Sequence, residues 1–237
     1  ITSFYVNGTI TIASTAIVAN AGNDVSIFQG NNTQLSASAT GGVTPYTYVW
    51  APAASLSNPN IANPVATPST TTTYTVTITG SNACSADDQV KVTVLKSLSV
   101  TVFLQGLYVE GGTMLQANDE FGPHFGAGIA DQVTIELHNQ ANYNSIVYTS
   151  PLANLSTNGV VSVGVPIELN ASYYLTIIHR NHLETTSALP VSFSGGSISY
   201  NFNAPSKAYG DNLIEMEDGA YAIYGGDVNQ DGVIDTA

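Results

Sequence analysis

Oxygen-bearing residues alternate along the end of the chain, in the stretch GGDVNQDGVIDTA. Counted from Asp227, the ligand positions of an EF-hand-type loop are filled by Asp227, Asn229, Asp231, the backbone carbonyl of Val233, and Asp235. Glycine occupies the sixth position, where the loop must turn sharply around the ion. Carboxylate, amide and carbonyl oxygens are the ligands of a hard cation. The sequence therefore predicts a Ca²⁺ site formed by these five residues.

The predicted calcium loop, residues 225–237, is incomplete. Its twelfth position normally supplies a bidentate carboxylate and would be residue 238, beyond Ala237. We therefore interpret 225–237 as a truncated loop. A polar Asx-turn loop that binds no metal is the alternative.

A second group of residues that could bind a metal or a substrate is found in YYLTIIHRNHLETTS, which contains His179, Arg180, His182 and Glu184. The two histidines could approach one metal across a turn, and a zinc site would need further ligands such as His138. Ordinary hydrogen-bonded polar residues are the favoured interpretation. We expect Arg180, the sole arginine, to pair with a carboxylate, either Glu136 or Glu184.

Sequence signatures of enzymes are missing from the chain. There is no Gly-X-Ser-X-Gly, P-loop, dinucleotide-binding glycine motif or His-Glu-X-X-His. Carboxylates around MLQANDEFGPHFGAGIAD could serve glycoside hydrolysis only if two faced each other across a cleft. We interpret this stretch as a long surface loop; the carboxylates are Glu110, Asp119, Glu120 and Asp131. The sequence thus predicts no catalytic residues and no organic cofactor.

Aromatic residues of the second half of the chain offer one further kind of site. A sugar-stacking face could be formed by Tyr143, Tyr148, Tyr173 and Tyr174. Half-buried strand residues are the favoured interpretation of these tyrosines, because tyrosine is common at such positions in β-sandwiches.

Charge limits the possible partners. The 237 residues include four Lys or Arg against seventeen Asp or Glu, a formal net charge of −13. Nucleic acids require clustered basic residues, so they are excluded as partners, and the same argument disfavours anionic membrane surfaces. No apolar run is long enough to span a bilayer, so no membrane insertion is expected.

Composition and spacing together predict an all-β chain. Only 9% of residues are charged and 43% are hydrophobic, with many β-branched residues and small turn formers. Short alternating runs are separated by Gly, Asn and Pro, and no 3.6-residue apolar period persists. Expected strands are Val25–Phe28, Thr33–Ala39, Thr47–Ala51, Thr72–Thr79, Asp88–Val94, Gln132–His138, Ser145–Tyr148, Gly159–Val165, Ser172–His179, Pro190–Phe193 and Ser197–Phe202.

The expected fold is two tandem antiparallel β-sandwiches followed by the calcium loop. Residues 1–19 form a hairpin or strand around Asn7-Gly8, residues 20–96 form the first sandwich, and residues 97–224 form the second. A short junction is expected from Val94 to Ser97. Trp50 is expected in the first core, and Tyr74 at the place of a tyrosine corner.

The first half carries a family resemblance in the blocks PYTYVW and TTTYTVTIT. Over residues 20–95 the chain resembles a polycystic-kidney-disease (PKD)-type immunoglobulin-like domain of secreted, surface-bound proteins from Bacteroidetes-like bacteria. The resemblance implies a spacer or adhesive module without catalytic groups. Because the chain has one cysteine, Cys84 is expected to be a small buried apolar residue.

The second half carries another resemblance, in FLQGLYVEGG, ADQVTIELHN, SYYLTIIHRNHLETTS and GAYAIYGGDVNQDG. Residues 98–237 are similar to a C-terminal β-module of Bacteroidetes surface proteins. In that group the module leads into dockerin-like calcium repeats and often a type IX secretion sorting domain. GDVNQDGVID matches the dockerin loop. The resemblance implies a secreted protein at the cell surface.

Three functions are consistent with the sequence. The first is a non-enzymatic extracellular structural or adhesive module, stabilised by calcium and binding surface proteins or polysaccharide. The second is a carbohydrate-binding accessory part of a secreted enzyme. The third is a filament subunit that associates with copies of itself by strand addition through its N-terminal residues.

Overall fold

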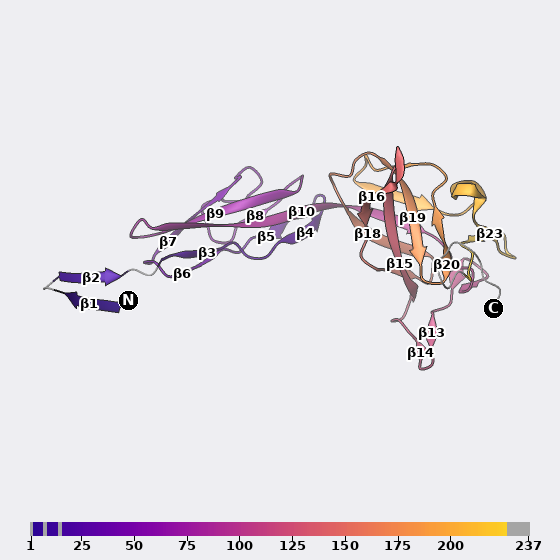
Figure 1. The fold of residues 1–237 in the computed structure, drawn as a ribbon, viewed down its shortest axis with the longest axis horizontal. Helices are drawn as coiled ribbons and strands as arrows, with labels where there is room; N and C mark the ends of the chain where they lie inside the picture. The colour runs from indigo at the N-terminus through magenta and orange to yellow at the C-terminus, as the bar shows by residue number, and fades with distance from the viewer. Residues whose placement is uncertain (1, 7–8, 14–15, 227–237) are drawn as a thin grey trace. The chain divides into compact units, whose positions relative to one another are not determined.

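The computed structural model describes residues 2–6, 9–13 and 16–226 (Figure 1). The chain divides into two compact units. Unit 1 comprises Ile1–Leu95 with Pro166–Glu168, and unit 2 comprises Lys96–Val165 with Leu169–Ala237. In the described part of the chain, the regular structure is β-strand apart from two short 3-10 helices. The predicted all-β class with antiparallel sheets is confirmed.

Unit 1 is built from strands β1 to β9 and the first part of β10. Their bounds are β1 Thr2–Val6, β2 Thr9–Ala13, β3 Val18–Asn20, β4 Val25–Phe28, β5 Thr33–Gln34, β6 Ser38–Thr40, β7 Tyr46–Ala51, β8 Val65–Ala66, β9 Thr72–Gly80 and β10 Ser85–Thr101. β7, β9 and β10 pair antiparallel in that order, and β4 adds to β10 in parallel. β3 pairs with β6, β5 with β8, and β1 with β2.

The core of unit 1 lies between the sheet of β4, β7, β9 and β10 and the two strand pairs β3–β6 and β5–β8. Tyr74, Val76 and Ile78 alternate on one face of β9 and are fully buried, as the period of two predicts. Trp50 is 1% exposed, and its indole Nε1 donates to the carbonyl of Ile61 at 3.0 Å. The predicted core tryptophan is therefore confirmed.

Tyr74 differs from the tyrosine corner that the sequence predicts. Its hydroxyl lies 2.5 Å from the hydroxyl of Ser55, nineteen residues upstream in the chain. A tyrosine corner bonds to backbone a few residues upstream. The ring is buried as expected, but its hydroxyl is satisfied by a side chain.

Unit 2 contains the end of β10 and the later elements. Their bounds are β11 Tyr108–Val109, β12 Thr113–Met114, β13 Asn118–Asp119, β14 Gly122–Pro123, β15 Ile129–Asn139, β16 Asn142–Thr149, β17 Ala153–Ser156, β18 Val160–Pro166, β19 Ser172–His179, β20 His182–Thr186, β21 Val191–Ser192, β22 Ser197–Asn201, η1 Pro205–Lys207, η2 Tyr209–Asp211, β23 Ile214–Glu215 and β24 Tyr221–Ala222.

The main sheet of unit 2 has the order β16-β15-β19-β20, with β17 beside β15 and β21 beside β19. A second layer pairs β18 and β22 with β10. Leucine, isoleucine, valine and phenylalanine side chains from both layers form one core. Lys96 is also buried in unit 2, and its Nζ donates to the carbonyls of Phe193 at 2.5 Å and Leu169 at 3.1 Å.

The predicted junction at Val94–Ser97 contains the boundary between the two units, at Leu95 and Lys96, and it is strand, because β10 runs without interruption through these residues. Two other expectations about local structure are wrong. The predicted surface loop after Met114 contains the small hairpin of β13 and β14, which projects from unit 2 in Figure 1. Cys84 is exposed rather than buried, because it lies in the turn between β9 and β10.

Candidate functional site

Strand alternation places two ionisable residues on the core face of the unit 2 sheet. Asp131 precedes the buried residues Val133, Ile135 and Leu137 at the same period of two in β15. His179 likewise follows Leu175 and Ile177 in β19. β15 and β19 are paired neighbours, so the two polar side chains reach the same end of the sheet.

Four side chains meet there, and we call them the His-pair cluster: Asp131, His179, Arg180 and His182. Nη2 of Arg180 donates to Oδ2 of Asp131 at 2.6 Å, and Nε2 of His179 lies 3.3 Å from the same oxygen. Nδ1 of His182 lies 2.8 Å from Nδ1 of His179. The backbone N–H of Asn181 also donates to Nδ1 of His179, at 3.2 Å.

These contacts assign the tautomers of both imidazoles. Because Nδ1 of His179 accepts, the proton of that ring lies on Nε2 and faces Asp131. His182 then donates through Nδ1, and its Nε2 carries a lone pair. That atom is buried and has no hydrogen-bond partner among the described residues. The contacts thus run from His182 through its hydrogen bond to His179, whose Nε2 lies 3.3 Å from the carboxylate of Asp131.

Burial dominates the electrostatics of the two histidines. It lowers the pKa of His179, an effect that the charge of Asp131 opposes. It lowers the pKa of His182 to about 4, and the neighbouring His179 adds to the decrease. Both rings are therefore neutral at pH 7, and the ion pair of the cluster joins the guanidinium of Arg180 to the carboxylate of Asp131.

The His-pair cluster borders a cleft of about 410 Å³. Its wall includes Gly106, Asn118 and the C-terminal residues Gly225 and Gly226. Arg180 reaches solvent there, with 52% of its side chain exposed, whereas both imidazoles and Asp131 are buried. In chemical terms the cluster holds a strand end in place and presents a guanidinium to the cleft.

The structure corrects the expected partner of Arg180, because it pairs with Asp131 rather than Glu136 or Glu184. The structure does not bring together all the histidines of the possible zinc site, which was the less favoured interpretation. His138 lies opposite Tyr174 in the β15–β19 register, away from the His179 end, and its Nε2 lies 3.3 Å from Glu136. Within residues 2–6, 9–13 and 16–226, no three His, Cys, Asp or Glu side chains are placed to hold a metal ion.

Sequence reasoning missed Asp131 as the centre of this cluster, although a signal was present. Asp131 stands at alternate positions with Val133, Ile135 and Leu137 in its strand, so its side chain is expected on the same buried face. A buried carboxylate requires a cationic or hydrogen-bonding partner. Arg180 is the one arginine of the chain, and it lies in the turn after β19, the strand that pairs with β15.

The predicted calcium ligands Asp227, Asn229, Asp231, Val233 and Asp235 lie outside the described residues. The segment that leads to them is described up to Gly226. Leu183 donates its N–H to the carbonyl of Tyr224 at 2.9 Å, and Gly226 donates to Asn181 at 3.0 Å. Gly225 donates to Oε1 of Gln105 at 3.0 Å. The chain is thus bound to β20 and its turn directly before Asp227.

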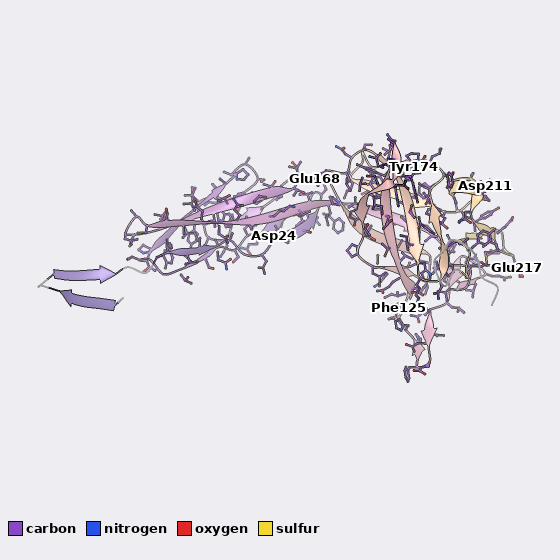
Figure 2. The ribbon with its side chains drawn as sticks, in the orientation of Figure 1. Asp24, Phe125, Glu168, Tyr174, Asp211 and Glu217 are labelled. Atoms are coloured by element: carbon purple, nitrogen blue, oxygen red, sulfur yellow. The ribbon has the colours of Figure 1, made fainter. Side chains whose placement is uncertain are left out.

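A second hollow lies on the outer face of the same sheet. It measures about 360 Å³ and is lined by Tyr143, Tyr174, Thr186 and Tyr209. Figure 2 labels Tyr174, which projects from β19. The other two tyrosines of the expected sugar-stacking face lie elsewhere: Tyr173 is buried against Phe193, and Tyr148 donates to the carbonyl of Gly164. The structure therefore brings together two of the four, with Tyr209 added from η2.

Carboxylates that could serve glycoside hydrolysis are not gathered in one cleft. Asp131 is buried and paired with Arg180, whereas Asp119 lies in the β13–β14 hairpin and contacts His124 at 2.9 Å. The described residues contain no helix long and apolar enough to cross a membrane.

No protein-family model matches the chain, and no curated protein matches it. Among solved structures, three N-terminal domains of the highly immunogenic outer capsid protein of bacteriophage RB49 are 11% identical, with a TM-score of 0.30, covering 78% of this chain and 70% of that one. Mouse cadherin-23 EC22-24 is 13% identical, with a TM-score of 0.25, covering 78% and 65%. A gamma-CGTase from an alkalophilic Bacillus clarkii is 12% identical, with a TM-score of 0.26, covering 75% and 26%. Likenesses of this size carry no functional argument.

Proposed function

We propose that the chain is a non-enzymatic extracellular module that acts as a spacer or adhesive unit and is stabilised by calcium at its C-terminal end. The observation that carries the proposal is the internal pairing of the groups best able to do chemistry. Asp131, His179 and His182 are buried, and His179 contacts both of the others, so these groups interact inside unit 2 and help to hold its fold.

Calcium has a structural role in this proposal. Asp227, Asn229, Asp231, Val233 and Asp235 offer the hard oxygen ligands that Ca²⁺ prefers. The segment directly before Asp227 is hydrogen-bonded to unit 2, so the ligand sequence starts from an anchored residue. An ion that binds the folded chain more tightly than the unfolded chain stabilises the folded state by mass action.

The family resemblances define the rest of the proposal. The resemblance to a PKD-type domain over residues 20–95, followed by a β-module with a dockerin-like loop, implies a cell-surface protein of a group that often carries a type IX secretion sorting domain. Partners of such a module are other surface proteins, polysaccharide or further copies of the chain. The net charge of −13 disfavours anionic partners, and it opposes association of the chain with its own copies unless calcium or local contacts compensate.

A calcium titration tests the metal part. With about 10 mM Ca²⁺, a concentration suited to weak extracellular sites, the thermal midpoint is expected to rise by several degrees. Asp231→Ala removes a ligand and abolishes the rise, whereas Asp211→Ala, an exposed residue on η2, leaves it intact. An unchanged midpoint and no heat of binding in the native chain would remove calcium from the proposal.

Bead experiments test the adhesive part. Beads that carry the chain are mixed with beads coated with the same chain, with surface protein or with polysaccharide, and clustering is measured. Adhesion to at least one surface supports the proposal. Release of reducing ends or peptide fragments from the coats by the folded protein would instead show an enzyme.

A further inference from the structure

The pocket lined by Tyr143, Tyr174, Thr186 and Tyr209 presents three phenol rings around one space; we call the three tyrosines the aromatic corner. The ring centroids of Tyr143 and Tyr174 are 6.0 Å apart, and their planes meet at 70°. Two rings at this angle form adjacent walls. Tyr209 adds a further wall from η2 and is 72% exposed.

The walls of the aromatic corner are supported from behind. The ring of Tyr143 stacks on the imidazole of His138, with centroids 4.2 Å apart and planes 4° apart. His138 is itself held by Nδ1 against the carbonyl of Tyr143 at 2.7 Å and by Nε2 beside Glu136. The position of Tyr143 is therefore fixed before any ligand arrives, which lowers the entropic cost of binding.

Polar atoms at the base of the pocket already have partners. The hydroxyl of Tyr143 contacts Thr186 at 2.8 Å, Thr176 at 3.1 Å and Glu184 at 3.1 Å. Thr176 and Thr186 also contact each other at 2.9 Å. The three hydroxyls have three hydrogens for these four contacts; the hydrogen of Tyr143 is used by Glu184, so its hydroxyl has no donor left for a ligand. A hydroxyl-rich saccharide would find ring faces here but few free hydrogen-bonding groups.

Charge favours a positive ligand. The carboxylate of Glu184 accepts a hydrogen bond from the Tyr143 hydroxyl at 3.1 Å and is exposed beside the pocket, whose own lining contains no charged residue. Asp211 belongs to the same 3-10 helix as Tyr209, and Lys207 belongs to η1. The whole chain carries −13. A cation over phenol rings is attracted by their negative faces and needs no hydrogen bond.

We propose that the aromatic corner binds a quaternary alkylammonium group, with Tyr143, Tyr174 and Tyr209 contacting its methyl groups and Glu184 supplying the opposing charge. The volume of about 360 Å³ accommodates such a head with its attached chain. This site is distinct from the calcium loop and from the His-pair cluster, and it does not depend on the proposed function.

Titration of the full chain with choline tests the proposal, and its neutral isostere 3,3-dimethyl-1-butanol provides the matched comparison. Choline is expected to bind at least about fivefold more tightly, because the two differ only in charge. Tyr209→Ala is expected to weaken choline binding about five- to tenfold, Tyr209→Phe to leave it nearly unchanged, and Glu184→Gln to weaken choline but not the butanol. Phe121→Ala changes an exposed aromatic residue in another hairpin and leaves all affinities unchanged.

Several outcomes would overturn the proposal. They are equal binding of choline and the butanol, tighter binding of a neutral disaccharide than of choline, choline binding that survives Tyr209→Ala, and no binding at all. A comparison of free choline with trimethyllysine distinguishes the two common sources of the group, and either preference supports the proposal. None of these titrations depends on calcium or adhesion, so a negative result leaves the proposed function unaffected. A negative result in the calcium or bead experiments likewise leaves the alkylammonium site unaffected.

Discussion

Nδ1 of His182 lies 2.8 Å from Nδ1 of His179, and the two buried rings meet at 75°. One nitrogen must donate and the other accept, so the contact exists only while at least one ring is neutral at that atom. Protonation of both rings would place two cations in a buried space beside Arg180. The arrangement therefore makes the end of the unit 2 sheet sensitive to acid.

The folded state is expected to lose stability as the pH falls from about 6.5 to about 4. The pKa of His182 is lowered from 6.5 to about 4 by burial, so between these values the unfolded chain binds more protons than the folded chain. Stability thus rises with pH across this window, by about 3 kcal/mol in total from this residue. Urea midpoints measured from pH 4 to pH 8 check the slope.

The control for this titration is His182→Asn, which keeps an N–H donor toward His179 without a titrating ring. This variant should show a clearly flatter profile than the native chain. His124→Asn, which removes an exposed histidine, should keep the native slope above pH 5. A native slope in His182→Asn would contradict the assignment.

Removal of Arg180 is expected to destabilise unit 2 more than removal of an ordinary surface cation. Asp131 is buried, so Arg180→Met leaves a buried carboxylate poorly compensated, at a cost of about 2–3 kcal/mol. Adding Asp131→Asn removes that charge and should recover part of the loss. Denaturant unfolding of the two single variants and the double variant measures the coupling. Additive free energies of unfolding would show that the two residues do not interact.

Gly159 is expected to tolerate no side chain, for two separable reasons. Its φ is +79°, and a Cβ atom there would lie 2.6 Å from the ring of Phe103. Gly111 has a similar φ of +83° with nothing near its Cβ position, so Gly111→Ala measures the backbone cost alone, about 1 kcal/mol. Gly159→Ala should cost about 3 kcal/mol in thermal or urea unfolding. Phe103→Leu in the Gly159→Ala background should recover the steric part, and equal costs for the two alanine variants would exclude a clash.

Cys84 is expected to react with a maleimide in the folded protein at nearly the rate of a free thiol. It is exposed in a turn, so labelling needs no unfolding. Mass spectrometry should show one adduct under native conditions, with an unchanged thermal midpoint. If labelling required denaturant, Cys84 would be buried in the folded protein, as the sequence alone led us to expect.

The strands were predictable where one face of the sheet is buried. β4 and β19 have the predicted bounds, β7 and β9 are each one residue longer at one end, and β15 is longer by three residues at its start and one at its end. In these segments, β-branched and aromatic residues alternate with polar ones, so local pattern and tertiary burial agree. β10 was cut short in the prediction because Lys96 and Ser97 resemble a linker. Lys96 is tolerated in the strand because two backbone carbonyls accept from its amine.

The candidate sites depended on pairings that a sequence does not display directly. The contact of Asp131 with Arg180 joins residues 49 positions apart, and the aromatic corner joins Tyr143 on β16 to Tyr209 on η2. Asp131 falls at the end of the expected surface loop, one residue before the expected strand, although the apolar residues at alternate positions after it indicate burial. Nothing in the pattern around Tyr209 indicates that a short 3-10 helix carries it over the sheet. Such packing is decided by loop geometry rather than by periodicity.

In unit 1, β4 and β10 run parallel, with Val25 opposite Val92 and Phe28 opposite Leu95. β4 lies early in unit 1, and the continuous first part of that unit ends in β10 at Leu95. A pull on the two ends of this part would act along the two strands in opposite directions and load the hydrogen bonds between them together, in shear. We therefore expect unit 1 to resist such a pull better than a pair of strands whose hydrogen bonds open one after another.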